Sequence, residues 1–384
     1  MPLEPDLPGA EVLPPELRRP DGRSAYEAPG GRLYATPAHV HTERLLAAAA
    51  NRGGGPALTA QAAAGVVAAL AEAGIELGAD QAAAVCGILT SGAAVETLVG
   101  PAGTGKSFVV GALTKAWQDP ALWDGAVHRV VGLATSQIAT EVLAGEGLEA
   151  RNITRWLATQ HRLAEGGTHA EDVPWRLAAG DLVVVDESAM TNTADLAAIH
   201  AHTEQAGAKL LLTGDHRQLV VVGAGGGMSM VAAAAPSYEL AEARRFANRW
   251  ERQASLRLRD GDQGALADYH RHGRIIDGGA IEQTEALAAR AWLADTLSGR
   301  HSLLIVDTNE QAARLSAHIR AELIGSAACT RPACHWGCKA PGPGSGTWSK
   351  PATTPGTSPA TKVTAAAPSI ASSTASWKPA PTAA

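Results

Sequence analysis

The chain has 384 residues, of which 46% are hydrophobic, and a formal net charge of −6. This apolar content is enough for a covered globular core, and the slightly acidic balance excludes bulk electrostatic attraction as a reason to bind nucleic acid. Because the chain has no long apolar run, no signal-peptide pattern and only four cysteines, we expect a cytoplasmic protein that neither crosses nor enters a membrane.

The first segments of the chain differ in composition. Residues 1–32 are rich in proline, glycine and charge, so we expect a disordered leader that buries too little apolar area to offset the entropy of ordering. Residues 33–76 are expected to form a small helical region. Its first helix should begin after Thr36, which can cap a helix whose first residue is Pro37.

From residue 93 onwards, short apolar runs alternate with longer helical patterns, which is typical of an α/β fold with a parallel sheet. Nearly continuous runs of valine and leucine predict strands buried on both faces. The predicted strands are Val95–Gly100, Arg129–Ala134, Asp181–Asp186 and Lys209–Gly214.

Another apolar run, Ser302–Asp307, precedes a helical pattern over Glu310–Leu323. Together they predict the start of a further α/β unit. Residues 326–384 lose all periodicity and are mostly Pro, Ala, Thr, Ser and Gly, so a disordered low-complexity tail is expected there. Its abrupt onset suggests a truncated or frame-shifted reading.

The clearest motif is GPAGTGKS at residues 100–107, which lies between a predicted strand and a predicted helix. An isolated glycine-rich loop is usually an ordinary turn, but the complete pattern in this setting predicts a phosphate-binding loop for ATP and Mg²⁺. Lys106 would reach the β and γ phosphates, and Ser107 would bind Mg²⁺. The residues expected to contact the nucleotide here are Gly100, Pro101, Ala102, Gly103, Thr104, Gly105, Lys106, Ser107 and Phe108.

Two later strands also end in polar residues. Asp186 and Glu187 follow the run LVVV, where an acidic pair would otherwise be a helix cap or a solvated charge. Because ligands bind at the carboxyl ends of parallel strands, we expect Asp186 to hold Mg²⁺ and Glu187 to act as general base. Gln218, in TGDHRQL, would sense the γ phosphate.

Taken together, GPAGTGKS, VVVDESAM and LLTGDHRQL resemble motifs I, II and III of superfamily 1 DNA helicases. The RecD-like branch and the helicase portion of TraI/TrwC-type conjugative relaxases are the most similar, over Tyr34–Leu323. The resemblance implies a RecA-like ATPase domain over residues 77–300 and the start of an incomplete second one over 301–325. It also implies single-stranded DNA, and relaxase or conjugation-complex proteins, as partners.

The resemblance carries further residues. Gln81 matches the glutamine that reads adenine, although a solvated glutamine at a helix start is the simpler alternative. Thr135 and Thr154 match DNA-facing positions, and the segment holding Thr154 also reads as a helix cap. Arg245 takes the position of an arginine that reaches the γ phosphate, with Arg244 as the fallback.

Several features point away from a complete motor. We find neither motifs V and VI of the family nor its relaxase portion with a histidine pair and a nicking tyrosine ahead of the motor; Tyr34 has no histidine cluster arranged beside it, and His39 and His41 are expected at the surface. A basic segment could bind DNA or form a solvated helix face, and we favour the solvated face. A zinc site in the tail is disfavoured because the tail has a single CxxxC spacing. The residues concerned are Arg249, Arg252, Arg257 and Arg259 in the basic segment and Cys329, Cys334, His335 and Cys338 in the tail; Cys86 is expected in the core.

Three functions therefore stay open at the level of the sequence. The first is the ATP-binding motor domain of a RecD-like helicase, inactive if the second domain is missing. The second is a P-loop ATPase that acts as a nucleotide-dependent switch without translocation. The third is a remnant that has lost nucleotide affinity.

Overall fold

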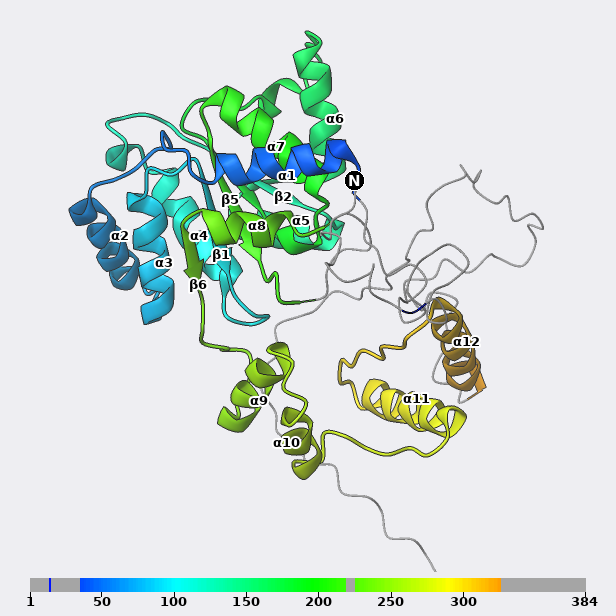
Figure 1. The fold of residues 1–384 in the computed structure, drawn as a ribbon. Helices are drawn as coiled ribbons and strands as arrows, with labels where there is room; N and C mark the ends of the chain where they lie inside the picture. Colours follow the sequence, from blue (N-terminus) through cyan, green and yellow to red (C-terminus); the bar gives the residue numbers. More distant parts are fainter. Residues whose placement is uncertain (1–13, 15–34, 219–224, 326–384) are drawn as a thin grey trace, which may run out of the picture. The chain divides into compact units, whose positions relative to one another are not determined.

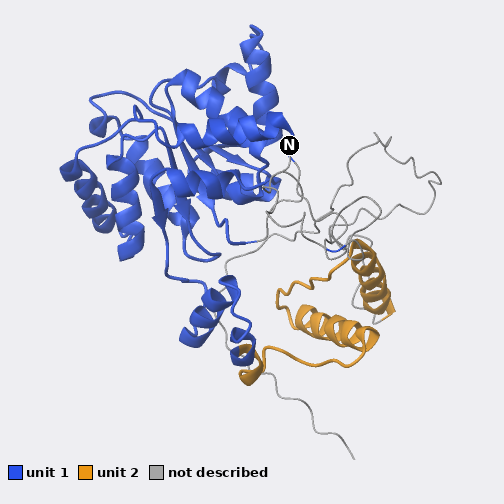
Figure 2. Cartoon of the chain, viewed as in Figure 1, with its two compact units in different colours: residues 1–268 blue, residues 269–384 orange. Residues whose placement is uncertain are grey.

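A computed structural model of the chain describes Pro14, residues 35–218 and residues 225–325. The described chain forms two compact units, residues 1–268 and 269–384 (Figure 2). The predicted leader, apart from Pro14, and the predicted tail with its cysteines and histidine lie outside the described residues. The division into 77–300 and 301–325 follows motifs rather than contacts and stays a prediction.

The first unit is built on one six-stranded sheet in which every pairing is parallel. The predicted α/β fold with a parallel sheet is confirmed, and all four predicted strands form within a residue of their expected ends. The strands, in the order β3-β2-β4-β5-β1-β6, are β1 Val95–Val99, β2 Val130–Ala134, β3 Glu149–Asn152, β4 Leu182–Val185, β5 Lys209–Gly214 and β6 Ser237–Glu239.

Helices cover both faces of this sheet (Figure 1). Strand β4 shows why: Leu182 and Val184 pack into one apolar cluster, and Val183 and Val185 pack into the other, since successive side chains point to opposite faces. One face is covered by α2 Ala60–Glu72, α3 Ala79–Thr90, α4 Lys106–Trp117 and α5 Gln137–Gly145, and the other by α1 Pro37–Ala49, α6 Ile153–Ala164, α7 Thr193–Ala206 and α8 Gly227–Ala234.

The remaining elements of the first unit connect these layers or follow them. The first helix begins as predicted, because the Thr36 side chain accepts a hydrogen bond from the His39 backbone N–H at 3.1 Å and Pro37 is the first helical residue. Short 3-10 turns and the last helices are η3 Pro120–Leu122, η4 Val173–Trp175, η5 Ser188–Met190, α9 Arg249–Arg259 and α10 Ala265–Arg271, which reaches into the second unit.

The register brings the carboxyl ends of three central strands together. Val185 pairs with Leu212, and Val99 pairs with Gly214. The residues that follow β1, β4 and β5 therefore emerge at the same edge of the sheet. This is the edge at which ligands of open α/β sheets bind.

A fully buried ion pair connects the side chains of two neighbouring strands, β1 and β5. Lys209 Nζ is 2.9 Å from Glu96 Oε2, and both side chains are 0% exposed. The ammonium also donates hydrogen bonds to the Ile88 and Ser91 carbonyls at 2.9 and 2.6 Å, while the Tyr238 hydroxyl donates to Glu96. The pair thus joins β1, β5 and β6 to the end of α3.

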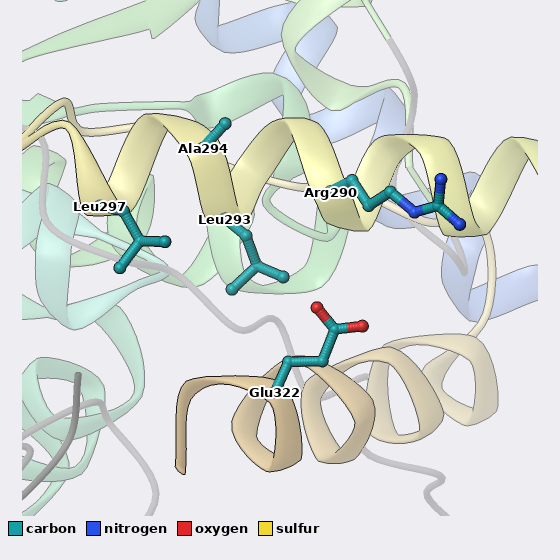
Figure 3. A pocket seen from close by; sticks show the side chains of 5 residues that line it. All are labelled: Arg290, Leu293, Ala294, Leu297 and Glu322. Carbon is teal, nitrogen blue, oxygen red and sulfur yellow. The ribbon is translucent and has the colours of Figure 1, made fainter. Parts of the chain in front are cut away.

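The second unit contains two longer helices, α11 Ile281–Leu297 and α12 Asn309–Gly325. Leu293 and Leu315 belong to the small apolar cluster between them. A pocket on this helix pair holds none of the predicted site residues; it is lined by Arg290, Leu293, Ala294, Leu297 and Glu322 (Figure 3).

The predicted strand over Ser302–Asp307 is wrong. The helix expected after it does form as α12, but residues 301–306 have no regular structure, and Ile305 is 79% exposed. A strand needs a neighbour to satisfy its backbone groups. None of the strands in the described ranges pairs with this run.

Candidate nucleotide site

The glycine-rich loop joins β1 to α4 in the predicted strand, loop, helix order. Gly103 and Gly105 have φ values of 84° and 86°, a left-handed conformation that favours glycine. Lys106, the first residue of α4, donates hydrogen bonds from its ammonium to the Gly100 and Pro101 carbonyls at 2.7 and 3.2 Å. The lysine is thereby folded back over its own loop.

This loop fits a phosphate chain. A side chain added at Gly103 would come within 2.4 Å of Arg245, and one added at Gly105 would come within 2.5 Å of Gln81, so only glycine lets these two neighbours pack this closely against the loop. No side chain caps the start of α4, whose first N–H groups are left for an anion. Ser107 lies in this first turn, where it could serve Mg²⁺.

The acidic pair follows β4 in a strained turn. Asp186 accepts a hydrogen bond from the Thr213 hydroxyl at 2.6 Å, and Ser188 donates to the Thr213 carbonyl at 2.8 Å. Between them, Glu187 has a left-handed backbone with φ 49°. Such a conformation costs a non-glycine residue about 1–3 kcal/mol and is concentrated at functional sites. The hydrogen bonds that Asp186 and Ser188 make with Thr213 therefore fix the turn on both sides of Glu187.

Electrostatics connect the lysine to both strand ends. Burial lowers the pKa of Lys106, and three carboxylates oppose this shift, those of Asp186, Asp215 and Glu187. One cation thus faces the acidic residues that follow β4 and β5. These strand-end charges act on the P-loop lysine, although they come from separate parts of the sequence.

Gln218 is attached to this group through Asp215. Its side-chain N–H donates to Asp215 Oδ2 at 3.0 Å. Asp215 is itself almost buried and receives two further hydrogen bonds from Arg259, at 2.8 and 2.7 Å. Burial alone would raise the pKa of Asp215, but the bonds from Arg259 and from the Arg217 backbone outweigh it and lower that pKa.

The Gln81 side chain lies against the other side of the loop. Its amide donates to the Thr104 carbonyl at 3.0 Å and accepts from the Gly78 backbone at 3.0 Å. Gln81 is 2% exposed, which contradicts the alternative of a solvated glutamine at a helix start. Its proposed contact with adenine stays a prediction.

The two adjacent arginines have different surroundings. Arg244 bonds to Asp80 at 2.6 Å and to the Thr104 carbonyl at 3.0 Å, so it ties α3 to the P-loop. Arg245 packs against Gly103, and no acceptor among the described residues engages its guanidinium. This difference favours Arg245 over Arg244 as the residue that can turn towards a phosphate.

Substituting these arginines separately should distinguish their roles. We expect Arg245→Ala to lower the ATPase rate by about 10²-fold, the usual effect of removing one electrostatic donor, with little change in melting temperature. Arg244→Ala should instead lower the free energy of unfolding by about 1–2 kcal/mol, because it leaves Asp80 without its charged partner. Turnover and urea unfolding of both variants check this, and equal losses of turnover would contradict it.

The predicted DNA-facing threonines lie on adjacent strand ends. Asn152 donates to the Thr135 carbonyl at 2.8 Å and accepts from the Thr154 backbone N–H at 2.9 Å, so it caps α6 and links both positions. Both threonines are exposed. The cap and the DNA contact are compatible, since the cap uses the Asn152 side chain and leaves the threonine hydroxyls free for other contacts.

Sequence reasoning missed one residue of this region. The sequence predicts that Arg259 belongs to a solvated basic helix face, yet its side chain is only 10% exposed and pairs with Asp215. The signal was weak, because 44 residues separate the partners.

Cys86, expected in the core, packs partly buried against the larger apolar cluster. Within the described ranges, no helix is long and apolar enough to span a membrane.

The fold and the loop together define a P-loop nucleoside triphosphatase. The chain belongs to the AAA domain family, whose model matches residues 76–280. It is also similar to TraA proteins. It is 28% identical over 232 residues to the "Probable conjugal transfer protein TraA" of Sinorhizobium fredii and 30% identical over 235 residues to the conjugal transfer protein TraA of Agrobacterium fabrum.

Each of these alignments covers 60% of this chain and 20% of the relative, so the chain spans about a fifth of their length. Similar solved structures include the PRRSV helicase, with 15% identity and a TM-score of 0.23 over 38% of this chain and 30% of that one. A DNA replication initiation factor has 13% identity and a TM-score of 0.28 over 62% and 83%. TM-scores this low support no conclusion about function.

Proposed function

We propose that this chain binds and hydrolyses ATP with Mg²⁺ as the motor domain of a RecD-like DNA helicase that moves along single-stranded DNA. The observation that carries the proposal is that the ends of β1, β4 and β5 lie at one edge of the sheet, with Asp186, Glu187 and Asp215 within electrostatic range of Lys106. The likeness to TraA proteins supports a place in conjugal transfer, with relaxase or conjugation-complex proteins as partners.

The residues present can divide the work of hydrolysis. Lys106 and the loop N–H groups would bind the phosphates, and Ser107 and Asp186 would hold Mg²⁺, which neutralises phosphate charge when bound. Glu187 would accept a proton from water as the water oxygen bonds to the γ phosphorus. The bond to the bridging oxygen then breaks, and ADP departs with the electron pair. Gln218 would orient the water and Arg245 would stabilise the charge on the transferred group.

Nucleotide binding is tested by thermal unfolding with and without MgATP. At a concentration of about 100 times the dissociation constant, the ligand should stabilise the wild type by about 2.7 kcal/mol. Lys106→Ala should lose this stabilisation. Lys115→Ala, an exposed lysine on the same helix, should keep it. If MgATP stabilises neither the wild type nor Lys115→Ala, nucleotide binding is refuted and the chain is a remnant.

The coupling to DNA is tested by the ATPase rate with and without single-stranded DNA. A motor should be stimulated, and substituting Thr135 and Thr154 together by alanine should reduce that stimulation without changing the basal rate. An ATPase rate that stays the same when single-stranded DNA is added would instead indicate a nucleotide-dependent switch. That alternative draws on the same P-loop and requires no DNA contact.

A further inference from the structure

A hydrogen-bond relay centred on the buried Asp215 connects helix α9 to the exposed Gln218, the predicted phosphate sensor. We define the Asp215 relay as Arg259, Asp215 and Gln218. The Asp215 carboxylate accepts hydrogen bonds from Arg259 Nε at 2.8 Å, Arg259 Nη2 at 2.7 Å and Gln218 Nε2 at 3.0 Å. A fourth, from the Arg217 backbone at 3.1 Å, completes its coordination.

The Arg259 pair differs from an ordinary surface ion pair. The side chains of Asp215 and Arg259 are only 2% and 10% exposed, and the two parallel bonds form the fork that arginine makes with carboxylates. Exposed pairs of this kind contribute little to stability. A shielded bidentate pair fixes both groups in one orientation, so Asp215 cannot rotate away from Gln218.

The relay is also within electrostatic reach of the P-loop. The charges of both Asp215 and Arg259 act on Lys106, the first raising its pKa and the second lowering it. Arg259 is the last residue of α9, which follows the segment that carries Arg245. The pair therefore links the sheet edge at β5 to a helix far along the sequence.

The chemistry of a carboxylate determines how the Gln218 amide is presented. An ionised carboxylate accepts hydrogen bonds and cannot donate them, so the amide must turn its NH₂ group towards Asp215. The amide oxygen of Gln218 is then left as an acceptor. A residue that orients an attacking water needs such an acceptor, because the water must donate a proton to it while its lone pair faces phosphorus.

We propose that Arg259 is a positioning residue for hydrolysis, which locks Asp215 so that Gln218 keeps its amide oxygen towards the water. This inference rests on the proposed ATPase function. It assigns to Arg259 a role that its place in a basic helix did not suggest. Arg259 does not touch the reacting atoms and acts only through the carboxylate.

The test compares Arg259→Gln with a matched control on the same helix. Arg257 also holds two carboxylates, Asp262 at 2.7 Å and Asp268 at 2.8 Å, but it does not contact Asp215. Arg259→Gln should lower kcat by up to about 100-fold, as expected for a misplaced water-orienting group, with the Kd for MgATP within about threefold of wild type. Arg257→Gln should leave kcat unchanged.

Two further variants separate positioning from general destabilisation. Arg259→Lys should recover only part of kcat, since an ammonium cannot form the bidentate pair. Combining Asp215→Asn with Arg259→Gln should be no slower than the slower single variant, because both act on the same amide. If Arg259→Gln lowers kcat no more than Arg257→Gln does, or if the two losses multiply, the inference is overturned.

A binding readout keeps the inference distinct from the proposed function. Thermal unfolding with MgADP and aluminium fluoride, which mimics the group in transfer, should show extra stabilisation over MgADP in wild type and Arg257→Gln. Arg259→Gln should lose only this extra part. If the wild type binds the mimic but does not hydrolyse ATP, the motor function is refuted, and the relay is still tested by the extra stabilisation. If the mimic adds the same stabilisation to wild type, Arg257→Gln and Arg259→Gln, the relay alone is overturned. A wild type that no nucleotide stabilises overturns both.

Discussion

Glu187→Gln is expected to reduce the ATPase rate by about 10²–10⁴-fold, the range attributed to a positioned general base, while MgATP still binds. The substitution keeps the shape of the side chain and removes only its ability to accept a proton. The P-loop, Lys106 and Asp186 are unchanged, so the Kd for MgATP should stay close to that of wild type. Single-turnover hydrolysis and isothermal titration measure the two quantities separately.

The strained backbone at this position offers a second variant. Glu187→Gly removes both the carboxylate and the cost of a left-handed non-glycine residue. It should be as slow as Glu187→Gln but no less stable than wild type. Glu141→Gln, an exposed glutamate on α5, serves as the control with unchanged turnover. A Glu187→Gln protein that hydrolyses ATP within threefold of wild type would remove Glu187 from the chemistry.

Lys209→Ala is expected to lower the free energy of unfolding by about 3–5 kcal/mol, because it leaves the Glu96 carboxylate buried without its partner. Urea unfolding measures this loss. Lys115→Ala, which removes an exposed lysine, should change the free energy by less than about 0.5 kcal/mol. Replacing the pair with apolar side chains, Glu96→Leu with Lys209→Met, should cost less than Lys209→Ala alone. A cost below 1 kcal/mol for Lys209→Ala would contradict the burial of this pair.

The loss should also depend on pH. Burial raises the pKa of Glu96, and the charge of Lys209 partly opposes this rise. Without Lys209 the pKa rises further, so the folded carboxyl keeps its proton over a wider range in which the unfolded one has lost it. The folded state then binds more protons, and its stability falls as pH increases through that range. Lys209→Ala should therefore be more destabilised at pH 8 than at pH 5.

How far the sequence predicts this protein depends on the kind of element. The central strands were predictable because each is buried on both faces and shows as an apolar run. The edge strands β3 and β6, with the sequences EARN and SYE, carry no such run. They form because β2 and β1 supply hydrogen-bond partners, which is information that a local pattern does not contain.

The candidate site shows the same limit. The P-loop and the acidic pair could be predicted because their spacing and context are specific. The partner of Asp215 could not, since a basic helix such as α9 looks solvated until its contacts are known. The choice between Arg244 and Arg245 likewise depended on Asp80, which lies on another helix. Local periodicity in the sequence does not predict ion pairs between residues that are far apart along the chain.

The first two helices set a lower limit on any fragment intended for expression. The family match begins at residue 76, yet α1 and α2 precede it and pack on the helices that cover opposite faces of the sheet, α1 on α7 and α8 and α2 on α3, with Leu46 in one apolar cluster and Leu70 in the other. A fragment cut at the match boundary would expose valine and leucine on both surfaces at once, and exposed apolar patches favour aggregation. The smallest soluble version should therefore start no later than Ala35.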